Sequence, residues 1–166
     1  MPIRAAVDAD VPGIRTCVRE AYEVYLDRME RPPAPLRDDP AARVRAGQVF
    51  VDAVESVRGV VVLIPFPDHL LLENLAVRPT VQRHGIGTRL LVFAERRAAE
   101  LGLPEVRLYT NERMAENLRY YRARGYRETG RAVEDGYSRV FLSKSLPSGP
   151  GRGGARTPAV RRRRGV

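Results

Sequence analysis

The sequence predicts a single domain of the mixed α/β class. Along residues 1–146, short apolar runs of strand length alternate with longer segments whose apolar residues recur at helical spacing. The chain has 166 residues, enough for one hydrophobic core and few for two. Apolar residues make up 43% of the chain and charged residues 30%, which is an ordinary globular composition. We therefore expect residues 1–146 to form one packed domain.

The N-terminal segment is expected to form a strand and then a helix. The strand covers residues 3–6; Asp10 is suited to cap the helix and Pro12 to occupy its first turn. The apolar face of this helix, which would pack on a sheet, consists of Ile14, Val18, Ala21, Tyr22 and Tyr25. The proline-rich stretch 31–35 excludes regular helix and central strand, so it predicts a loop with a recognition role before a short helix over 39–46.

The middle and the end of the domain supply the remaining elements. Strands are predicted over 48–53, 59–64 and 69–77, the first two joined as a hairpin around Glu55 and Ser56, which favours an antiparallel meander. The pattern then predicts a helix over 85–100, a strand over 106–109, a helix over 112–124, and strands over 126–134 and 137–143. The order of elements is that of a mixed α/β domain.

The basic charge of the chain is concentrated at its C-terminus. The formal net charge is +9, but six arginines among the last twenty residues account for most of it and leave +3 for the rest. Residues 147–166 are rich in Gly, Pro and Arg with few apolar side chains, so we expect a disordered tail. Such a tail can bind RNA, anionic lipid or an acidic protein electrostatically, or it is only a solvated appendage.

Several classes of protein are disfavoured by what the sequence lacks. No stretch approaches the roughly 20 apolar residues that span a bilayer, and no apolar segment follows the charged N-terminus, so we expect a cytoplasmic protein. Cys17 is the only cysteine and the two histidines, His69 and His84, have no cysteine neighbours, so no metal site or disulfide is expected. Cys17 is interpreted as a small buried residue.

The clearest functional signal is a glycine-containing helix start after a buried strand. Gly85 and Gly87 would let a ligand approach the backbone, where unpaired first-turn amides and the helix dipole favour an anion. The apolar face that would fix this helix consists of Ile86, Leu90, Phe93, Ala94 and Ala98. No Lys-Ser/Thr pair follows the second glycine and no third glycine completes a dinucleotide motif, so neither ATP nor NAD is favoured.

Two blocks of the sequence resemble the GNAT superfamily of N-acetyltransferases. The run Gln-Arg-His-Gly-Ile-Gly at 82–87 is similar to its Gln/Arg-x-x-Gly-x-Gly/Ala signature, and residues 110–126 resemble its later helix through Asn117, Tyr121, Gly125 and Tyr126. Tyr121 would share a helical face with Met114 and Leu118, while Tyr120 is interpreted as a packing residue.

The resemblance implies an acyl-CoA N-acyltransferase fold and acetyl-CoA as co-substrate. This fold has a mixed, mostly antiparallel sheet flanked by helices, with a central parallel pair that splays apart, here near Val77 and Tyr109. The pantetheine arm would lie between the two strands. The implied cofactor-binding residues are Leu75, Ala76 and Val77 through their backbone, Gln82, Arg83, His84, Gly85, Ile86, Gly87 and Thr88 around the pyrophosphate, and Asn117 and Tyr121. Arg89, like Arg83, would either add charge near phosphate or be solvated.

The resemblance also assigns the chemistry. A lysine-like amine, with a pKa of about 10.4, must lose a proton before it attacks the thioester, so a base is needed. Glu73 interrupts an apolar strand at the family's usual base position and is expected to be that base, or else to make a structural hydrogen bond or lie on an exposed strand face. Tyr121 would protonate the leaving thiolate, and a strand amide around Ala76 would stabilise the oxyanion.

The acceptor is left open by the sequence. Residues expected to shape its site are Tyr22, Tyr25, Arg28, Met29 and Arg31, together with Tyr137. A protein N-terminus, a lysine side chain, an aminoglycoside, a polyamine and an amino acid all fit this description. Besides an N-acetyltransferase acting by direct attack in a ternary complex, two alternatives stay open: a non-catalytic acetyl-CoA sensing module, and a nucleic-acid or ribosome-associated factor using the basic tail. We expect a monomer or a homodimer.

Overall fold

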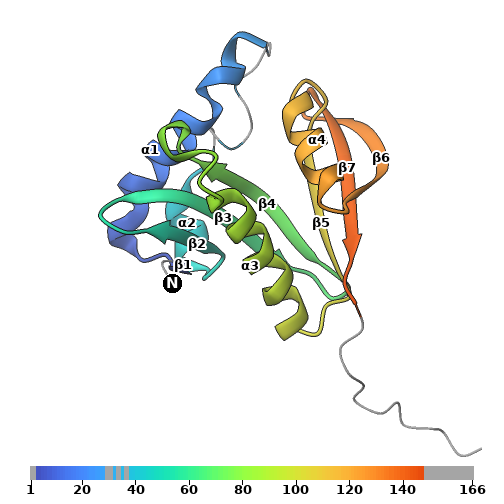
Figure 1. Ribbon diagram of the computed structural model, residues 1–166, viewed down its shortest axis with the longest axis horizontal. Coiled ribbons are helices and arrows are strands. Elements are labelled where there is room, and N and C mark those ends of the chain that lie inside the picture. The colour runs from blue at the N-terminus through green and yellow to red at the C-terminus, as the bar shows by residue number, and fades with distance from the viewer. Residues whose placement is uncertain (1–2, 29–31, 33–34, 36–37, 148–166) are drawn as a thin grey trace, which may run out of the picture.

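The computed structural model describes residues 3–28, 32, 35 and 38–147 (Figure 1). Two of the predicted acceptor residues, Met29 and Arg31, lie outside the described residues, as do residues 148–166 of the predicted tail. Most of the proline-rich loop 31–35 lies outside them too.

One mixed sheet of seven strands forms the centre of the molecule, in the order β1-β2-β3-β4-β5-β7-β6. Its strands are β1 (Ile3–Ala5), β2 (Val49–Ala53), β3 (Val57–Pro65), β4 (Leu70–Val77), β5 (Glu105–Asn111), β6 (Arg127–Glu134) and β7 (Tyr137–Ser145). All neighbouring strands pair antiparallel except β4 and β5, which are parallel. The predicted α/β class, the meander and the central parallel pair are confirmed.

The parallel pair separates soon after it forms. Pairing between β4 and β5 is limited to Leu70 with Val106, Leu71 with Arg107 and Leu72 with Leu108. Beyond these residues the two strands diverge, and Figure 1 shows the sheet opening into an N-terminal half ending at β4 and a C-terminal half starting at β5. The unpaired edges of the two strands therefore face one another across an opening.

Helices cover both faces of the sheet. They are η1 (Asp8–Asp10), α1 (Val11–Tyr22), η2 (Glu23–Arg28), α2 (Pro40–Arg45), η4 (Pro79–Val81), α3 (Ile86–Glu100) and α4 (Ala115–Ala123), where η marks a 3-10 helix. Helices α1 and α2 share one apolar core with β2 and β3, and α3 and α4 share another with β4, β5 and β7. The two cores explain the periodicity of the sequence, because each helix buries one apolar face on its side of the sheet.

A β-bulge in β4 changes which face its side chains occupy. Val62 of β3 pairs with Asn74, whereas the next residue, Leu63, pairs with Leu72, so Glu73 is an extra residue without a partner. The bulge is a departure from the uniform strand predicted over 69–77.

The consequence of the bulge is a switch in alternation. Before it, Leu70 and Leu72 point into the core beneath α3; after it, Leu75 and Val77 pack against that core instead, and Ala76 belongs to the core beneath α1. Strict alternation would have placed Ala76 with Leu72. The bulge thus turns the end of β4 by one residue where the strands splay.

Two helix starts differ from the prediction. Asp10 precedes α1, but its side chain caps no amide of that helix: it accepts a hydrogen bond from Val7 N at 2.8 Å and pairs with Arg4, because a 3-10 turn comes first. Helix α4 begins at Ala115, later than predicted, since the side chain of Asn111 accepts from Arg113 N at 2.9 Å and forms a turn there.

Candidate active site

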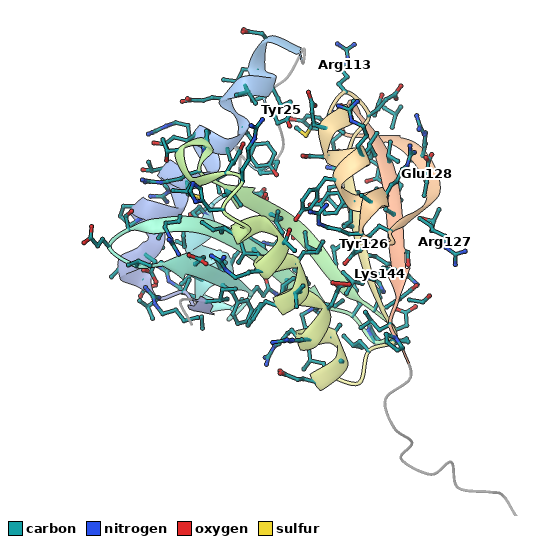
Figure 2. The ribbon with its side chains drawn as sticks, in the orientation of Figure 1. Tyr25, Arg113, Tyr126, Arg127, Glu128 and Lys144 are labelled. Carbon is teal, nitrogen blue, oxygen red and sulfur yellow. The ribbon has the colours of Figure 1, made fainter. Side chains whose placement is uncertain are left out.

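A cleft of about 540 Å³ lies at the opening between β4 and β5. Its walls come from the end of α1, η2, the last residues of β4, the start of α3 and one face of α4. Among the predicted residues, the cleft is lined by Leu75, Val77, Gln82, Arg83, Gly85, Ile86, Gly87, Thr88, Asn117, Tyr121, Tyr22 and Tyr25, the last labelled in Figure 2. Segments far apart in the sequence therefore meet at one site.

The start of α3 has the geometry of an anion site. Gly85 is its N-cap residue with φ +77°, a left-handed conformation that glycine adopts without strain, and Arg83 has φ 71°. The first hydrogen bond of the helix runs from Arg89 N to Gly85 O at 3.0 Å, so the amides of Ile86, Gly87 and Thr88 have no acceptor within the helix. These amides and the helix dipole favour a phosphate.

Gly87 keeps the narrow part of this cleft open. A Cβ at this position would lie 3.4 Å from the hydroxyl of Tyr120 and 3.6 Å from the side chain of Val77. A larger side chain would fill the space between β4, α3 and α4. The absence of a side chain here is therefore what leaves room for a ligand against the helix start.

Tyr120 and Arg124 were not predicted as site residues, yet both line the cleft. The Tyr120 hydroxyl lies 3.2 Å from Oγ1 of Thr88, and the Arg124 guanidinium stacks over the Tyr120 ring at 3.7 Å and donates to Thr88 Oγ1 at 3.2 Å. Tyr120, interpreted from the sequence as packing, thus contacts the predicted phosphate loop. The spacing of four residues between Tyr120 and Arg124 was the available signal, because it places both on one helical face.

The edge of β4 that faces the opening carries the backbone groups of Leu75 and Val77. Arg78 N donates to Arg58 O of β3 at 2.9 Å, and residues of an antiparallel strand alternate in direction, so Ala76 is directed to β3 and its two neighbours to the cleft. The side chain of Ala76 is buried on the far face. The strand amide expected near Ala76 is better supplied by Leu75 or Val77.

The loop before α3 is fixed by two further contacts. Gln82 Nε2 donates to Val77 O at 3.2 Å, and Arg89 Nη1 donates to His84 O at 3.2 Å. Arg89 also reaches Asp52 of β2, at 3.4 Å from its Oδ2, and neither Arg89 nor His84 lines the cleft. Of the two arginines considered for phosphate, only Arg83 faces the site.

Asp52 is a further charged residue near the site that was not predicted from the sequence. It is completely buried, and its Oδ1 accepts a 2.9 Å hydrogen bond from Arg58 Nε in addition to the contact with Arg89. Its signal in the sequence is a lone carboxylate inside the apolar strand 49–53. A buried carboxylate of this kind needs charged partners, and here they connect β2 to the start of α3.

Glu73 is held at the bulge by a charged neighbour. Its Oε1 accepts from Arg43 Nη2 of α2 at 2.9 Å, and its side chain is 12% exposed. Partial burial raises the pKa of Glu73, the Asp38 carboxylate raises it further, and the Arg43 guanidinium opposes the shift. The pKa of Tyr109 on β5 is also raised, first by burial and then by the Glu73 charge. A raised pKa makes the Glu73 carboxylate a stronger base than an exposed carboxylate.

Tyr121 lies where the cleft adjoins the apolar core. It is 6% exposed and packs edge-to-face on Tyr120 and Tyr126. Burial raises the pKa of its phenol, so the hydroxyl keeps its proton at neutral pH. Tyr121 can therefore donate a hydrogen bond in the cleft.

Glu73 faces a second cavity, of about 390 Å³, beneath α1 and α2. Asn74 lines this cavity and accepts a 2.7 Å hydrogen bond from the hydroxyl of Tyr22, which lines the first cleft.

Tyr137 of β7 donates to Pro32 O at 2.7 Å, so the predicted acceptor loop contacts the last hairpin. Arg28 is the last residue of η2, and its side chain is not among those that the structure describes.

Cys17 and His69, which were also considered for chemistry, have surroundings that indicate structural roles. Cys17 is fully buried, and burial raises the pKa of its thiol to about 12, which fits the interpretation as a small core residue. His69 contacts the Asp68 carboxylate at 2.7 Å and stacks on Phe66. Within the described residues, no group of three His, Cys, Asp or Glu side chains could hold a metal ion, and no helix is long and apolar enough to cross a membrane.

Comparison with solved structures identifies the fold. The PaiA N-acetyltransferase of Thermoplasma acidophilum, solved with coenzyme A, matches with a TM-score of 0.73 and 17% identity over 87% of this chain and 98% of that one. The IAA acetyltransferase of Bacillus cereus matches with 0.62 and 23% identity over 87% and 98%. The ribosomal-protein-S18-alanine N-acetyltransferase of Escherichia coli matches with 0.67 and 16% identity over 90% and 96%.

Sequence comparison identifies the family. No curated protein is similar enough in sequence to count as a relative. The model of the Acetyltransferase (GNAT) family, however, matches residues 14–126, which include β4, α3, β5 and α4. This match covers more than half of the chain and contains both blocks on which the resemblance rests. The chain belongs to the GNAT acetyltransferase family.

Proposed function

We propose that this protein transfers the acetyl group of acetyl-CoA to a primary amine by direct attack in a ternary complex. The observation that carries the proposal is the cleft at the splayed β4–β5 pair, where the glycine start of α3 meets the free edge of β4. Acetyl-CoA would supply a thioester as the activated acetyl donor. The coenzyme A bound in the PaiA N-acetyltransferase, which has the same fold, supports this choice.

The residues of the cleft suit the parts of the donor. The first-turn amides of α3 from Ile86 to Thr88 would bind the pyrophosphate, with Arg83 and Arg124 adding positive charge. The backbone groups of Leu75 and Val77 would form hydrogen bonds with the amides of the pantetheine arm. The arm would thus occupy the place of a neighbouring strand at the free edge of β4. Together these contacts would hold the thioester beside the bulge.

The proton transfers can be assigned to Glu73 and Tyr121. Glu73 would take a proton from the amine, directly or through a water, and its raised pKa makes it a better base than an exposed carboxylate. The neutral nitrogen then adds to the thioester carbonyl to form the C–N bond and a tetrahedral oxyanion. Collapse of this oxyanion breaks the C–S bond, while the nitrogen releases its second proton to water. Tyr121, which stays protonated in its buried position, would donate its proton or a hydrogen bond to the leaving thiolate. A strand amide of β4 would stabilise the oxyanion.

The experiment is a thiol-release assay with acetyl-CoA and a panel of primary amines. We expect turnover by the wild type and a loss of about 10²–10⁴-fold in kcat for Glu73→Gln, the range for removal of a general base. Glu55→Gln, the same change at an exposed turn residue, is the control and should leave kcat unchanged. Tyr121→Phe should lower kcat with little effect on the affinity for acetyl-CoA.

Two outcomes would contradict the proposal. A Glu73→Gln variant as active as the wild type would remove Glu73 from the proton transfer. Binding of acetyl-CoA without thiol release for any amine would instead favour a sensing module that uses the same cleft.

A further inference from the structure

The second cavity has the composition of a small-molecule pocket. It measures about 390 Å³ and lies between α1, α2 and the face of β2, β3 and β4. One part of its wall is formed by aliphatic side chains that are buried in the core: Ile14, Val18, Val49, Val60 and Val62. An apolar wall combined with a separate group of charged side chains fits a ligand that has an apolar body and a charged end.

The polar groups of the cavity are gathered at one end. Glu73 and Asn74 stand together at the bulge, and Asp38 and Arg43 are the charged neighbours of Glu73. Glu73 therefore has one guanidinium and one further carboxylate as its charged neighbours. This balance leaves negative charge to be neutralised, which favours a cation, such as an ammonium group, at this end.

The other arginines of the cavity do not reverse this balance. Arg15 pairs with Asp39 at 3.1 Å, and Arg19 lies 3.7 Å from Glu23. Both arginines are more than half exposed, so they belong to the mouth of the cavity. A carboxylate on the ligand would have to compete with these acidic partners, so an anionic acceptor is disfavoured.

The charged end of this cavity adjoins the cofactor cleft. Asn74 lines the cavity, and the Tyr22 side chain to which it is hydrogen-bonded lines the cleft. Glu73 is the bulge residue of the strand whose next residues, from Leu75, form the cleft wall. A nitrogen placed at Glu73 would thus lie two residues along β4 from the start of the cleft wall.

We propose that this cavity binds the acceptor, and that the acceptor is a primary amine on an unbranched aliphatic chain, with its ammonium at Glu73 and Asp38 and its chain against the valines. The inference rests on the proposed function, because it names the amine of that same reaction. It separates small alkylamines from amino acids, peptides and aminoglycosides, whose bodies are charged or polar.

Binding of amines can be measured without turnover. Propylamine, pentylamine and heptylamine are titrated calorimetrically into the protein with and without coenzyme A. Each added methylene should tighten binding about fourfold while it is buried, as its transfer free energy predicts. Pentan-1-ol, which lacks the ammonium, and 5-aminopentanoate, which adds a carboxylate, should bind at least about tenfold more weakly than pentylamine because they lose the ion pair or bury a charge. Affinities that do not change with chain length, or tighter binding of 5-aminopentanoate, would overturn the proposal.

Variants that fill the cavity provide a second test of the proposal. Val18→Phe should abolish the gain with chain length and leave the affinity for acetyl-CoA unchanged. Val92→Phe, the same change on the exposed face of α3, is the control. If Val18→Phe does not fold, Val62→Leu adds only one methylene to the cavity wall and should weaken heptylamine more than propylamine. Equal binding of all three amines by wild type and filled variants would overturn the proposal.

The two proposals fail in different ways. Acetyl-CoA binding together with acetylation of peptides, but no binding of alkylamines, would leave the acetyltransferase in place and reject this pocket. Absence of acetyl-CoA binding would reject the proposed function, while the amine titration would still decide whether the cavity takes alkylamines.

Discussion

The Tyr22 hydroxyl donates a 2.7 Å hydrogen bond to Oδ1 of Asn74, which fastens α1 to β4 at the residue after the bulge. Tyr22 is 8% exposed, whereas Asn74 is partly buried. The bond also stands between the two cavities that would hold donor and acceptor. It therefore links the packing of the first helix to the geometry of the site.

Removing this hydroxyl should destabilise the fold. In Tyr22→Phe the partly buried Asn74 amide loses its partner, and the expected loss is about 0.5–1.5 kcal/mol in the free energy of unfolding. Urea denaturation of Tyr22→Phe, Asn74→Leu and the double variant measures it as a cycle. A coupling free energy of about 1 kcal/mol is expected, and additive effects would show that the two side chains do not depend on one another.

For Tyr126, the same change to Phe is predicted to have the opposite effect on stability. It is buried, and within the described part of the chain it has no hydrogen-bond partner, although its ring contacts the Lys144 ammonium, 5.7 Å from the ring centre (Figure 2). Tyr126→Phe removes an unsatisfied polar group and keeps the ring, so stability should stay equal or rise by up to about 1 kcal/mol. A loss of 1 kcal/mol or more in urea denaturation would mean that the hydroxyl has a partner.

Arg43 is predicted to set the pH range of activity. Burial and Asp38 raise the pKa of Glu73 and Arg43 opposes them, so Arg43→Gln should raise this pKa further. A base acts only when deprotonated, and the variant's kcat/KM should therefore fall at a higher pH than that of the wild type. The ratio of variant to wild-type kcat/KM isolates this effect, because the titration of the amine is common to both.

The control for this prediction is Arg19→Gln, which removes an exposed arginine from the mouth of the same cavity. Its ratio to the wild type should not change with pH. If the Arg43→Gln ratio is also independent of pH, Glu73 is not the group whose ionisation limits the reaction on the acidic side.

Asp52 is expected to be important for stability and for the phosphate loop. Asp52→Asn leaves Arg58 and Arg89 without their buried carboxylate; because both guanidiniums are partly solvated, we expect a loss of about 2–4 kcal/mol rather than the full cost of a buried charge. Acetyl-CoA binding should weaken as well, since Arg89 holds His84 O. Glu128→Gln, which breaks exposed pairs, should cost much less in the same denaturation experiment, because solvent screens these pairs. Equal losses for the two variants would contradict this account.

Helices could be predicted from the sequence where their apolar periodicity and their terminal glycines depend only on residues nearby in the chain. The face from Ile86 to Ala98 predicted the burial of α3, and Gly125, with φ +91°, ends the helix where a glycine was expected. The two glycines before and within α3 predicted the helix start, because their role depends on nearby backbone alone.

Features that depend on distant partners escaped the sequence. Glu73 was recognised as unusual, but the bulge that turns it cannot be inferred from an apolar run, since it depends on the register with β3. The partners of Asp52 lie on β3 and α3, and the orientation of Tyr120 depends on Thr88 across the cleft. Tertiary contacts of this kind leave no periodic signal.

The most direct test of the central claim is the calorimetric titration of acetyl-CoA into the wild type and two variants. Gly87→Glu places a bulky anion against the predicted phosphate site, and unlike a change at Gly85 it does not strain a left-handed residue. Gly130→Glu introduces the same charge in open space on β6 and is the control. We predict micromolar binding by the wild type and Gly130→Glu, and none by a folded Gly87→Glu. Unchanged binding by Gly87→Glu, or no binding by a folded wild type, would contradict the assignment of acetyl-CoA to this cleft.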